Sequence, residues 1–154
     1  MLLTIISPAK KLDYSPVEKN IDSTIPSLLE HSSELIKDLK SLNPQEVSSL
    51  MSLSDKLGAL NYERFQEWET PFTKSNSKQA ILAFKGDVYQ GLDAESLSET
   101  ELMWAQKHIR ILSGLYGILK PMDLMQPYRL EMGTKFATKR GHNLYDFWNS
   151  IITE

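Results

Sequence analysis

The chain of 154 residues contains no cysteine, which excludes disulfides, thiolate zinc sites and cysteine nucleophiles. It also has no leader that combines basic residues with an apolar run, and Leu2–Ile6 is far too short to span a bilayer. We find no transmembrane stretch elsewhere in the sequence. These absences predict a cytoplasmic protein with no membrane partner.

Motifs for metals and nucleotides are missing as well. His31, His108 and His142 are widely spaced and form no HxxxH pattern, so the sequence predicts no metal site. No Walker loop and no GxGxxG occurs, and we expect no cofactor. The three tryptophans fall in helical patterns, which favours places in the core rather than roles as stacking platforms: Trp68, Trp104 and Trp148.

The formal net charge of −3 conceals an uneven distribution. Residues 21–103 carry seven Lys and Arg against fourteen Asp and Glu, whereas residues 104–141 carry seven against two. A local excess of five positive charges favours a partner that bears phosphate groups. The alternative is a solvated surface on which these charges are dispersed.

Leu112–Gly133 is the most informative stretch of the chain. Three glycines and two prolines interrupt it, so neither a helix nor a strand can run through it: Gly114, Gly117, Gly133, Pro121 and Pro127. The stretch is nevertheless too apolar for a disordered linker. We predict a buried, irregular segment that specific neighbours hold in place, as is common in functional sites.

The last twelve residues predict one apolar helix face, with side chains at helical spacing: Leu144, Phe147, Trp148, Ile151 and Ile152. No glycine, proline or basic last turn ends this helix. We therefore expect residues 1–154 to form a single domain that is the N-terminal portion of a longer one. The missing part would cover the apolar face.

The remaining pattern predicts an α/β fold with a mixed or mostly parallel sheet flanked by helices. Strands are expected at Leu2–Ile6, as a central strand covered on both faces, and at Gln79–Phe84 and Ile109–Leu112. Helices are expected from a Thr24 cap to Leu42, in two pieces within Leu50–Trp68 and at Val88–Leu92. Two further helices should begin with capping boxes, one at Asn43–Glu46 and one at Ser98–Glu101 that opens a helix to His108.

Polar residues collect where the predicted strands end: Ser7, Lys10 and Lys11, then Lys85 and Asp87, then Ser113. Ligands of open α/β sheets lie outside the carboxyl ends of the strands, so these groups could form one pocket. Such a pocket could hold an anion or transfer protons, with Tyr89 nearby. The alternative is that Ser7-Pro8 and Gly86-Asp87 only make turns.

Two other places offer charged ligands. Arg129 and Glu131 alternate in an extended stretch and would share a face, as a site pair or as a structural ion pair. Arg129 is the better ligand because guanidinium binds phosphate in a bidentate manner. Leu50–Trp68, with Lys56 and Arg64 around a turn at Gly58, is weakly similar to a helix-hairpin-helix that meets DNA phosphates. A plain helical corner is the alternative.

Five motifs in collinear order make the chain resemble the bacterial YaaA family of peroxide-stress-resistance proteins: Ser7–Lys10 (SPAK), Ser54–Leu57 (SDKL), Phe84–Leu92 (FKGDVYQGL), Leu112–Gly117 (LSGLYG) and Asp123–Gly133 (DLMQPYRLEMG). The resemblance covers essentially the whole chain. It implies an unusual α/β fold with a helix-hairpin-helix and a positively charged cleft that binds DNA. It also implies protection from hydrogen peroxide, associated with lowered free iron.

The sequence therefore supports two hypotheses about function. The first is a peroxide-stress protein that binds duplex DNA with little sequence preference, through Lys10, Lys56, Arg64, Lys85 and Arg129. The second is an enzyme acting on a nucleobase or nucleotide, with five candidate catalytic groups: Ser7, Lys10, Asp87, Tyr89 and Glu131.

Overall fold

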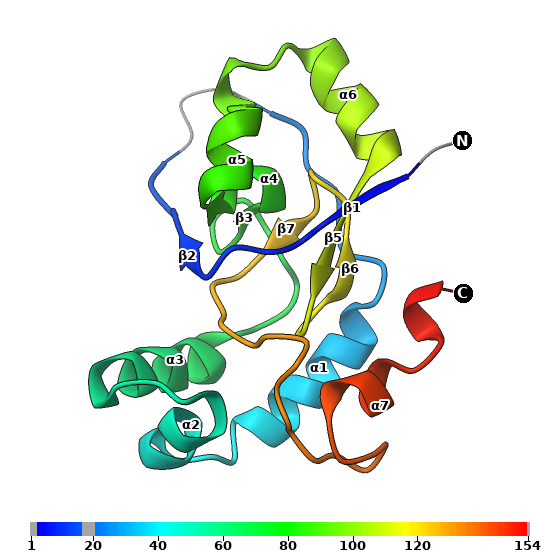
Figure 1. Ribbon diagram of the computed structural model, residues 1–154. Helices are drawn as coiled ribbons and strands as arrows, with labels where there is room; N and C mark the ends of the chain where they lie inside the picture. Colours follow the sequence, from blue (N-terminus) through cyan, green and yellow to red (C-terminus); the bar gives the residue numbers. More distant parts are fainter. Residues whose placement is uncertain (1–2, 17–20, 154) are drawn as a thin grey trace. The chain divides into compact units, whose positions relative to one another are not determined.

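The computed structural model describes residues 3–16 and 21–153, with seven helices and a mixed α/β arrangement in those residues (Figure 1). They form two compact units, and each unit combines segments that are distant in sequence. Unit 1 takes its residues from Met1–Ser27, Thr70–Leu112 and Ile118–Pro127. Unit 2 takes its residues from Leu28–Glu69, Ser113–Gly117 and Tyr128–Glu154.

The largest sheet has three strands in the order β1-β5-β6, and its strands are Thr4–Ile6, Ile109–Ser113 and Gly117–Leu119. β1 runs parallel to β5, with Thr4 opposite Ile109. Because only three residues join β5 to β6, those two strands form a hairpin, and the sheet is mixed. The predicted α/β class and the strand at Ile109 are therefore confirmed.

β1 differs from the central strand that the sequence suggested. It lies at an edge of the sheet, and the side chain of Ile5 is 58% exposed. A short, mostly apolar run such as Leu2–Ile6 does not distinguish a central strand from an edge strand, because that difference depends on whether a further strand pairs with its second edge. The prediction of a strand covered on both faces was wrong.

The second predicted strand, Gln79–Phe84, is replaced by three short elements. These are β3 (Lys78–Gln79), the single helical turn α4 (Ala80–Ala83) and β4 (Phe84–Lys85). β3 pairs antiparallel with β7 (Leu124–Met125), and β4 pairs antiparallel with β2 (Lys11–Leu12). The burial of this segment was predicted correctly. Its two ends, however, pair with different strands, β7 and β2, and the helical turn α4 changes the direction of the chain between them.

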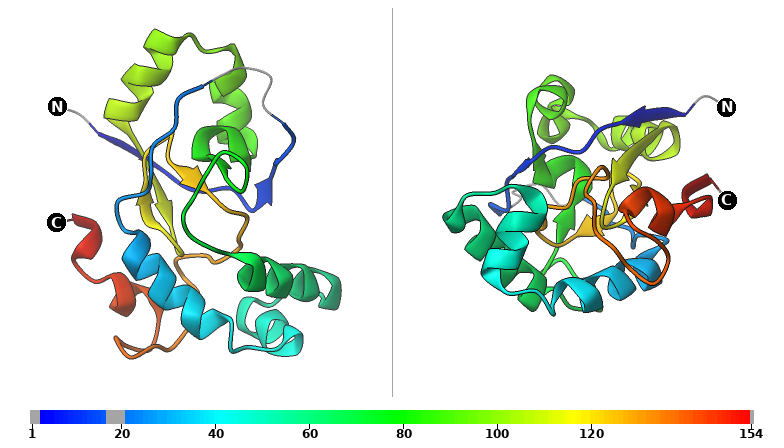
Figure 2. Two further views of the ribbon diagram at one scale, coloured as in Figure 1. Left: turned by 180° about the vertical axis from the view of Figure 1, so that it is seen from behind. Right: turned by 60° about the horizontal axis from the view of Figure 1, so that its bottom comes forward.

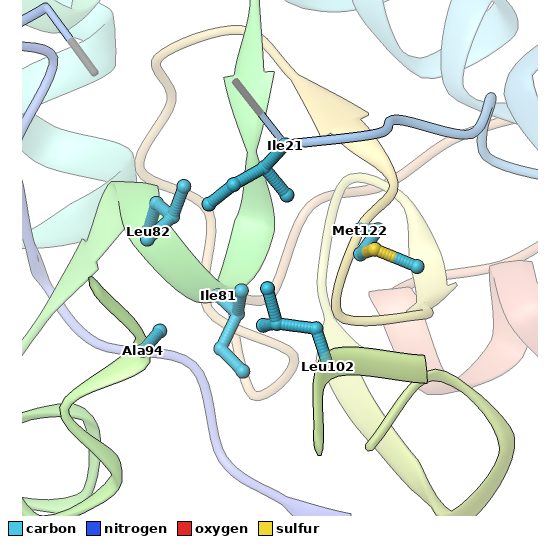
Figure 3. Close-up of a cluster of buried hydrophobic side chains, with 6 residues drawn as sticks. All are labelled: Ile21, Ile81, Leu82, Ala94, Leu102 and Met122. Carbon is cyan, nitrogen blue, oxygen red and sulfur yellow. The ribbon is translucent and has the colours of Figure 1, made fainter. Parts of the chain in front are cut away.

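α4 brings its apolar side chains into the core of unit 1. The cluster there gathers residues from five separate segments (Figure 3): Ile21, Ile81, Leu82, Ala94, Leu102 and Met122. Leu102 comes from α6 (Glu99–His108), which begins with the predicted capping box of Ser98 and Glu101. Ala94 comes from the short helix η1 (Ala94–Ser96), which follows α5 (Asp87–Leu92).

Unit 2 contains α1 (Leu29–Leu39), α2 (Pro44–Met51) and α3 (Asp55–Glu67). α2 has the predicted capping box between Asn43 and Glu46. The predicted Thr24 cap of α1 was wrong, because α1 begins at Leu29 and the Thr24 hydroxyl donates to Asp123 instead. None of the described helices in either unit has the length and apolar character that a bilayer crossing requires.

The C-terminal part of unit 2 is also shorter in regular structure than the sequence suggested. α7 spans Leu144–Trp148 and ends at Asn149, which has a positive φ of 43°, and the 3-10 helix η2 covers Ile151–Thr153. The expected uncovered face is present only in part, because Ile151 and Ile152 are half-buried whereas the other three side chains of that face are buried within this chain. Leu144 is 0% exposed, and Phe147 and Trp148 are each 1% exposed within this chain.

Trp148 is held by the irregular segment at Leu112–Gly133. Its indole Nε1 donates to the Gly114 carbonyl at 2.9 Å, and its ring lies against the backbone of Gly117. A Cβ at Gly117 would be 2.8 Å from the ring, and the φ of Gly117 is +74°. Glycine at this position therefore satisfies both the turn and the close approach of the tryptophan. In residues 113–126 only Ile118 and Lys120 are not buried, so the prediction of a buried irregular segment is confirmed for this part, whereas Glu131 and Gly133 at its end are exposed.

In unit 1 the same segment encloses a buried carboxylate. Asp123 is 2% exposed, accepts a hydrogen bond from the Thr24 hydroxyl at 2.6 Å and accepts another from the Lys120 backbone N–H at 2.8 Å. Gln106 of α6 donates to the Thr24 hydroxyl and accepts from the Met122 backbone N–H. Burial raises the pKa of Asp123, although these hydrogen bonds and the nearby Lys120 and Arg110 oppose the rise.

Gly117→Ala should destabilise the protein by about 2–4 kcal/mol, from the left-handed backbone and from overpacking against Trp148. Gly91→Ala is the matched control, because a Cβ at Gly91 of α5 meets no atom within 4 Å. The control should be neutral or should stabilise by about 0.5–1 kcal/mol. Urea unfolding measures both variants, and equal stabilities would contradict the packing described for Trp148.

Asp123→Asn should reveal the raised pKa of Asp123. The folded protein binds the Asp123 proton more readily than the unfolded chain does, so this contribution to stability is present at low pH and is lost as pH rises through the folded pKa. The asparagine variant cannot gain it. Unfolding free energies measured from pH 7 to pH 4 should therefore show the parent protein gaining relative to Asp123→Asn as pH falls. A gap that narrows with falling pH would contradict this assignment.

Candidate functional site

The ends of β1 and β4 meet on the surface of unit 1. Ser7–Leu12 continues from β1 into β2, which pairs with β4, so that Lys11 lies opposite Lys85. The Asp13 backbone N–H extends this pairing by donating to the Ala83 carbonyl at 2.7 Å. The structure therefore brings together the two segments that carry Ser7, Lys10, Lys85 and Asp87.

Three exposed lysines define what we call the lysine cluster: Lys10, Lys11 and Lys85. Lys11 and Lys85 are direct cross-strand partners, and like charges in such a pair destabilise a sheet. Lys11 was noted in the sequence as a polar residue after the first strand but was not named as a binding residue. Only the antiparallel register of β2 and β4 reveals its relation to Lys85.

A fourth lysine, Lys78, has an internal role. Its ammonium is buried and donates to the carbonyls of Asp13 and Ser15 at 2.8 and 3.0 Å. The Asp13 carboxylate accepts from the Ser15 backbone and hydroxyl, and these bonds, with smaller effects of Lys78 and Lys85, hold the pKa of Asp13 below its ordinary value. Asp13 is therefore ionised at neutral pH. It partly balances the positive charge beside the lysine cluster.

One candidate catalytic group, Tyr89, contacts the backbone at the end of β1. Tyr89 is buried and its hydroxyl donates to the Ser7 carbonyl at 2.7 Å, so Tyr89 fixes the end of β1. Ser7 and Asp87 are both exposed to solvent. Gly86 comes close to Ala9, with 3.3 Å between an added Cβ and the Ala9 Cβ, so the two segments lie near each other.

The third predicted strand end belongs to a different unit. Ser113 is 1% exposed in unit 2, where its hydroxyl accepts from the Tyr116 N–H and shares a 2.7 Å hydrogen bond with the Tyr128 hydroxyl. Burial raises the pKa of Tyr128, so its hydroxyl stays protonated. The Tyr116 hydroxyl in turn accepts from the indole of Trp68. These buried groups form a structural network in unit 2.

Arg129 and Glu131 also lie in unit 2. The Arg129 guanidinium is 3.9 Å from the Glu131 carboxylate, and the side chains are 20% and 55% exposed. This geometry is that of a loose, partly exposed ion pair, which contributes little to stability.

Lys56 and Arg64 lie on α3, which packs against α2. The connecting turn is Ser52–Ser54, with Ser52 in a left-handed conformation, so the expected turn at Gly58 was placed wrongly. Gly58 lies inside α3, where an added Cβ would be 1.6 Å from the Ser48 hydroxyl, and it serves the close packing of the two helices.

The start of α3 is not favourable for an anion. Ser54 caps the helix by accepting from the Leu57 N–H, and Asp55 occupies the first turn. Residues 44–69 carry two positive side chains against five negative ones: Lys56 and Arg64 against Glu46, Asp55, Glu63, Glu67 and Glu69. Carboxylates at a helix N-terminus occupy the place that a phosphate would need.

Comparison with known proteins places the chain in a family. A family model described as "Peroxide stress protein YaaA" matches residues 2–154. A "UPF0246 protein" of Saccharophagus degradans is 60% identical over 99% of this chain and 60% of its own length. Relatives with the same description in Cellvibrio japonicus and Teredinibacter turnerae are 56% and 59% identical, and in each the match spans 99% of this chain and 59% of the relative.

The chain thus spans about 60% of the length of the curated relatives that it matches. The match nevertheless runs through both units and includes every motif that suggested the resemblance. The chain belongs to the peroxide stress protein YaaA family.

Proposed function

We propose that this chain acts in peroxide stress by binding the phosphates of DNA through the lysine cluster of Lys10, Lys11 and Lys85. The observation that carries the proposal is the direct cross-strand pairing of Lys11 with Lys85. Two ammonium groups held opposite each other repel in the free protein, and a phosphate between them removes that repulsion. A site whose charges are unfavourable without a ligand is expected where binding, rather than stability, has been selected.

The surroundings of the lysine cluster support the same ligand. Lys11 and Lys85 are exposed on two short strands whose pairing fixes their spacing, and Lys10 is the exposed residue immediately before Lys11 in the chain. Phosphate contacts of this kind carry no base information, so we expect duplex binding with little sequence preference.

DNA binding offers a physical link to both peroxide and iron. Ferrous iron reduces hydrogen peroxide to hydroxide and a hydroxyl radical while it is oxidised to ferric iron, and cations that condense on DNA bring this reaction to the backbone. A protein that covers phosphates with lysines releases condensed counterions. In this account the protein lowers the iron available at DNA by displacing it from the phosphates.

The alternative location for DNA binding is the helix pair α2 and α3, which would act as a helix-hairpin-helix. Lys56 and Arg64 are its candidate contacts. Its support is weaker because acidic residues outnumber basic ones in residues 44–69 and because Asp55 occupies the first turn of α3. This location serves as the comparator in the experiment that follows.

Replacing the lysine cluster with glutamines (K10Q/K11Q/K85Q) should weaken duplex DNA binding and reduce the slope of log K against log salt by about 0.9 for each lost contact. K37Q/K40Q is the matched control, because Lys37 and Lys40 are exposed on unit 2 and lie outside the cluster. Fluorescence anisotropy of a labelled duplex at several salt concentrations measures both quantities. A triple variant that keeps the parent affinity and slope, or a larger loss in K56Q/R64Q, would reject this location.

Lys11→Gln should at the same time stabilise the free protein by about 0.2–1 kcal/mol, because it removes a like-charge pair. Lys37→Gln should have no such effect. Chemical unfolding without DNA tests this point separately from binding. Destabilisation by Lys11→Gln would mean that the lysine has a structural role, which would remove the main support for the proposal.

A further inference from the structure

The three tryptophans of this chain have very different surroundings. Trp68 and Trp148 are 5% and 1% exposed, and each donates its indole N–H to a partner within unit 2. Trp104 of α6 in unit 1 is 58% exposed. The sequence had suggested a core position for all three, and for Trp104 that prediction was wrong. Leu102 and Ala105 form the buried side of α6, so the packing of the helix does not require an indole at position 104.

The exposed indole nevertheless stacks on a neighbouring ring of the same helix. The ring of His108, one helical turn further on, stacks on Trp104 with 4.4 Å between centroids and an interplanar angle of 17°. His108 is fixed because its Nδ1 donates to the Trp104 carbonyl at 2.8 Å. One face of the indole is thus covered by an imidazole, and the high exposure of the residue leaves the other side to solvent. A flat aromatic surface that is ordered before binding loses little conformational entropy on stacking.

The charges on the C-terminal side of Trp104 favour an anionic partner. Lys107 is exposed three residues after Trp104, and therefore lies beside it on the helix surface. Arg110 bends back to the end of α6, where its guanidinium donates to the carbonyls of Gln106 and Ile109. The acidic residues of α6 are in its first turn, and Glu101 there accepts from the Ser98 N–H in the capping box.

We propose that Trp104, stacked on His108, binds an unpaired nucleobase, with Lys107 beside it facing the nucleic-acid backbone. This inference rests on the proposed DNA binding and extends it to a second site in unit 1. Bases inside a duplex are already stacked on both faces, so only single-stranded, frayed or flipped nucleotides can present a face to the indole. The protein should therefore prefer single-stranded DNA, or duplexes with unpaired positions, over intact duplex.

Tryptophan emission provides the direct test, because Trp104 is much more exposed than the two buried tryptophans. The full chain is titrated with an oligothymidylate of about 16 nucleotides and with a blunt duplex of similar length. The variants are Trp104→Leu, Trp104→Phe and, as a matched control on the same helix, Met103→Ala at a residue that is 45% exposed. K11Q/K85Q is included to separate this inference from the phosphate proposal.

We expect the oligothymidylate to quench the emission of the parent protein and of Met103→Ala. Trp104→Leu should lose the quenching and bind the oligothymidylate roughly tenfold more weakly, while its duplex affinity stays unchanged. Trp104→Phe should retain part of the affinity, because phenylalanine still stacks. K11Q/K85Q should weaken both DNAs and keep the preference for the single strand.

Three outcomes would overturn the inference in distinguishable ways. Salt-dependent binding of both DNAs with unchanged emission and unchanged affinity in Trp104→Leu would reject stacking and leave the phosphate contacts standing. Binding of neither DNA by the parent protein would reject both proposals. Self-association of the parent protein that Trp104→Leu abolishes, without a change in DNA binding, would identify the indole as a protein contact instead.

Discussion

The structure depends on one constraint, which is that a buried, irregular segment must have partners for its backbone N–H and C=O groups. Between Leu119 and Met125 the segment has almost no regular structure of its own, so the partners come from distant parts of unit 1. The donors and acceptors include a tyrosine hydroxyl, a glutamine amide and the backbone of two other segments: Tyr14, Thr24, Ala80, Ile81 and Gln106. These bonds bring together sequence positions more than 90 residues apart, such as Thr24 and Met122.

The candidate site follows from this constraint. Ala80 and Ile81 donate to the carbonyls of Asp123 and Pro121, which fixes α4 and therefore sets the direction in which β4 leaves it. β4 then pairs with β2, and this register places Lys85 opposite Lys11. Several polar side chains of unit 1 make hydrogen bonds inside the unit, as Tyr89, Lys78 and Thr24 illustrate. The lysine cluster is exposed to solvent at β2 and β4, and helix α6, which carries Trp104, lies on another part of the same unit (Figure 2).

Sequence reasoning found what depends on local chemistry. Capping boxes at Asn43 and Ser98, the strand at Ile109 and, for residues 113–126, the buried character of the segment Leu112–Gly133 were all predicted correctly, because neighbouring residues determine them. It failed where a residue that is distant in sequence determines the contact or the pairing. The Thr24 hydroxyl binds Asp123 rather than a helix end, and Gln79–Phe84 is divided between two partners. Trp148 was expected in the core, but Gly117 of this chain covers it, and not a segment outside residues 1–154. The same limit applied to the site, since no local pattern indicates that Lys11 faces Lys85 or that Trp104 is exposed.

The central claim is that nucleic acid is bound by unit 1, through short paired strands, and not by α2 and α3. Amide hydrogen exchange of the whole chain with and without DNA tests it most directly, because it reports each segment in one experiment. The account predicts that DNA slows exchange in peptides covering residues 7–13 and 84–87, with a further effect in α6 when the DNA is single-stranded. Slowed exchange confined to residues 44–67, with no change in the peptides of β2 and β4, would contradict it.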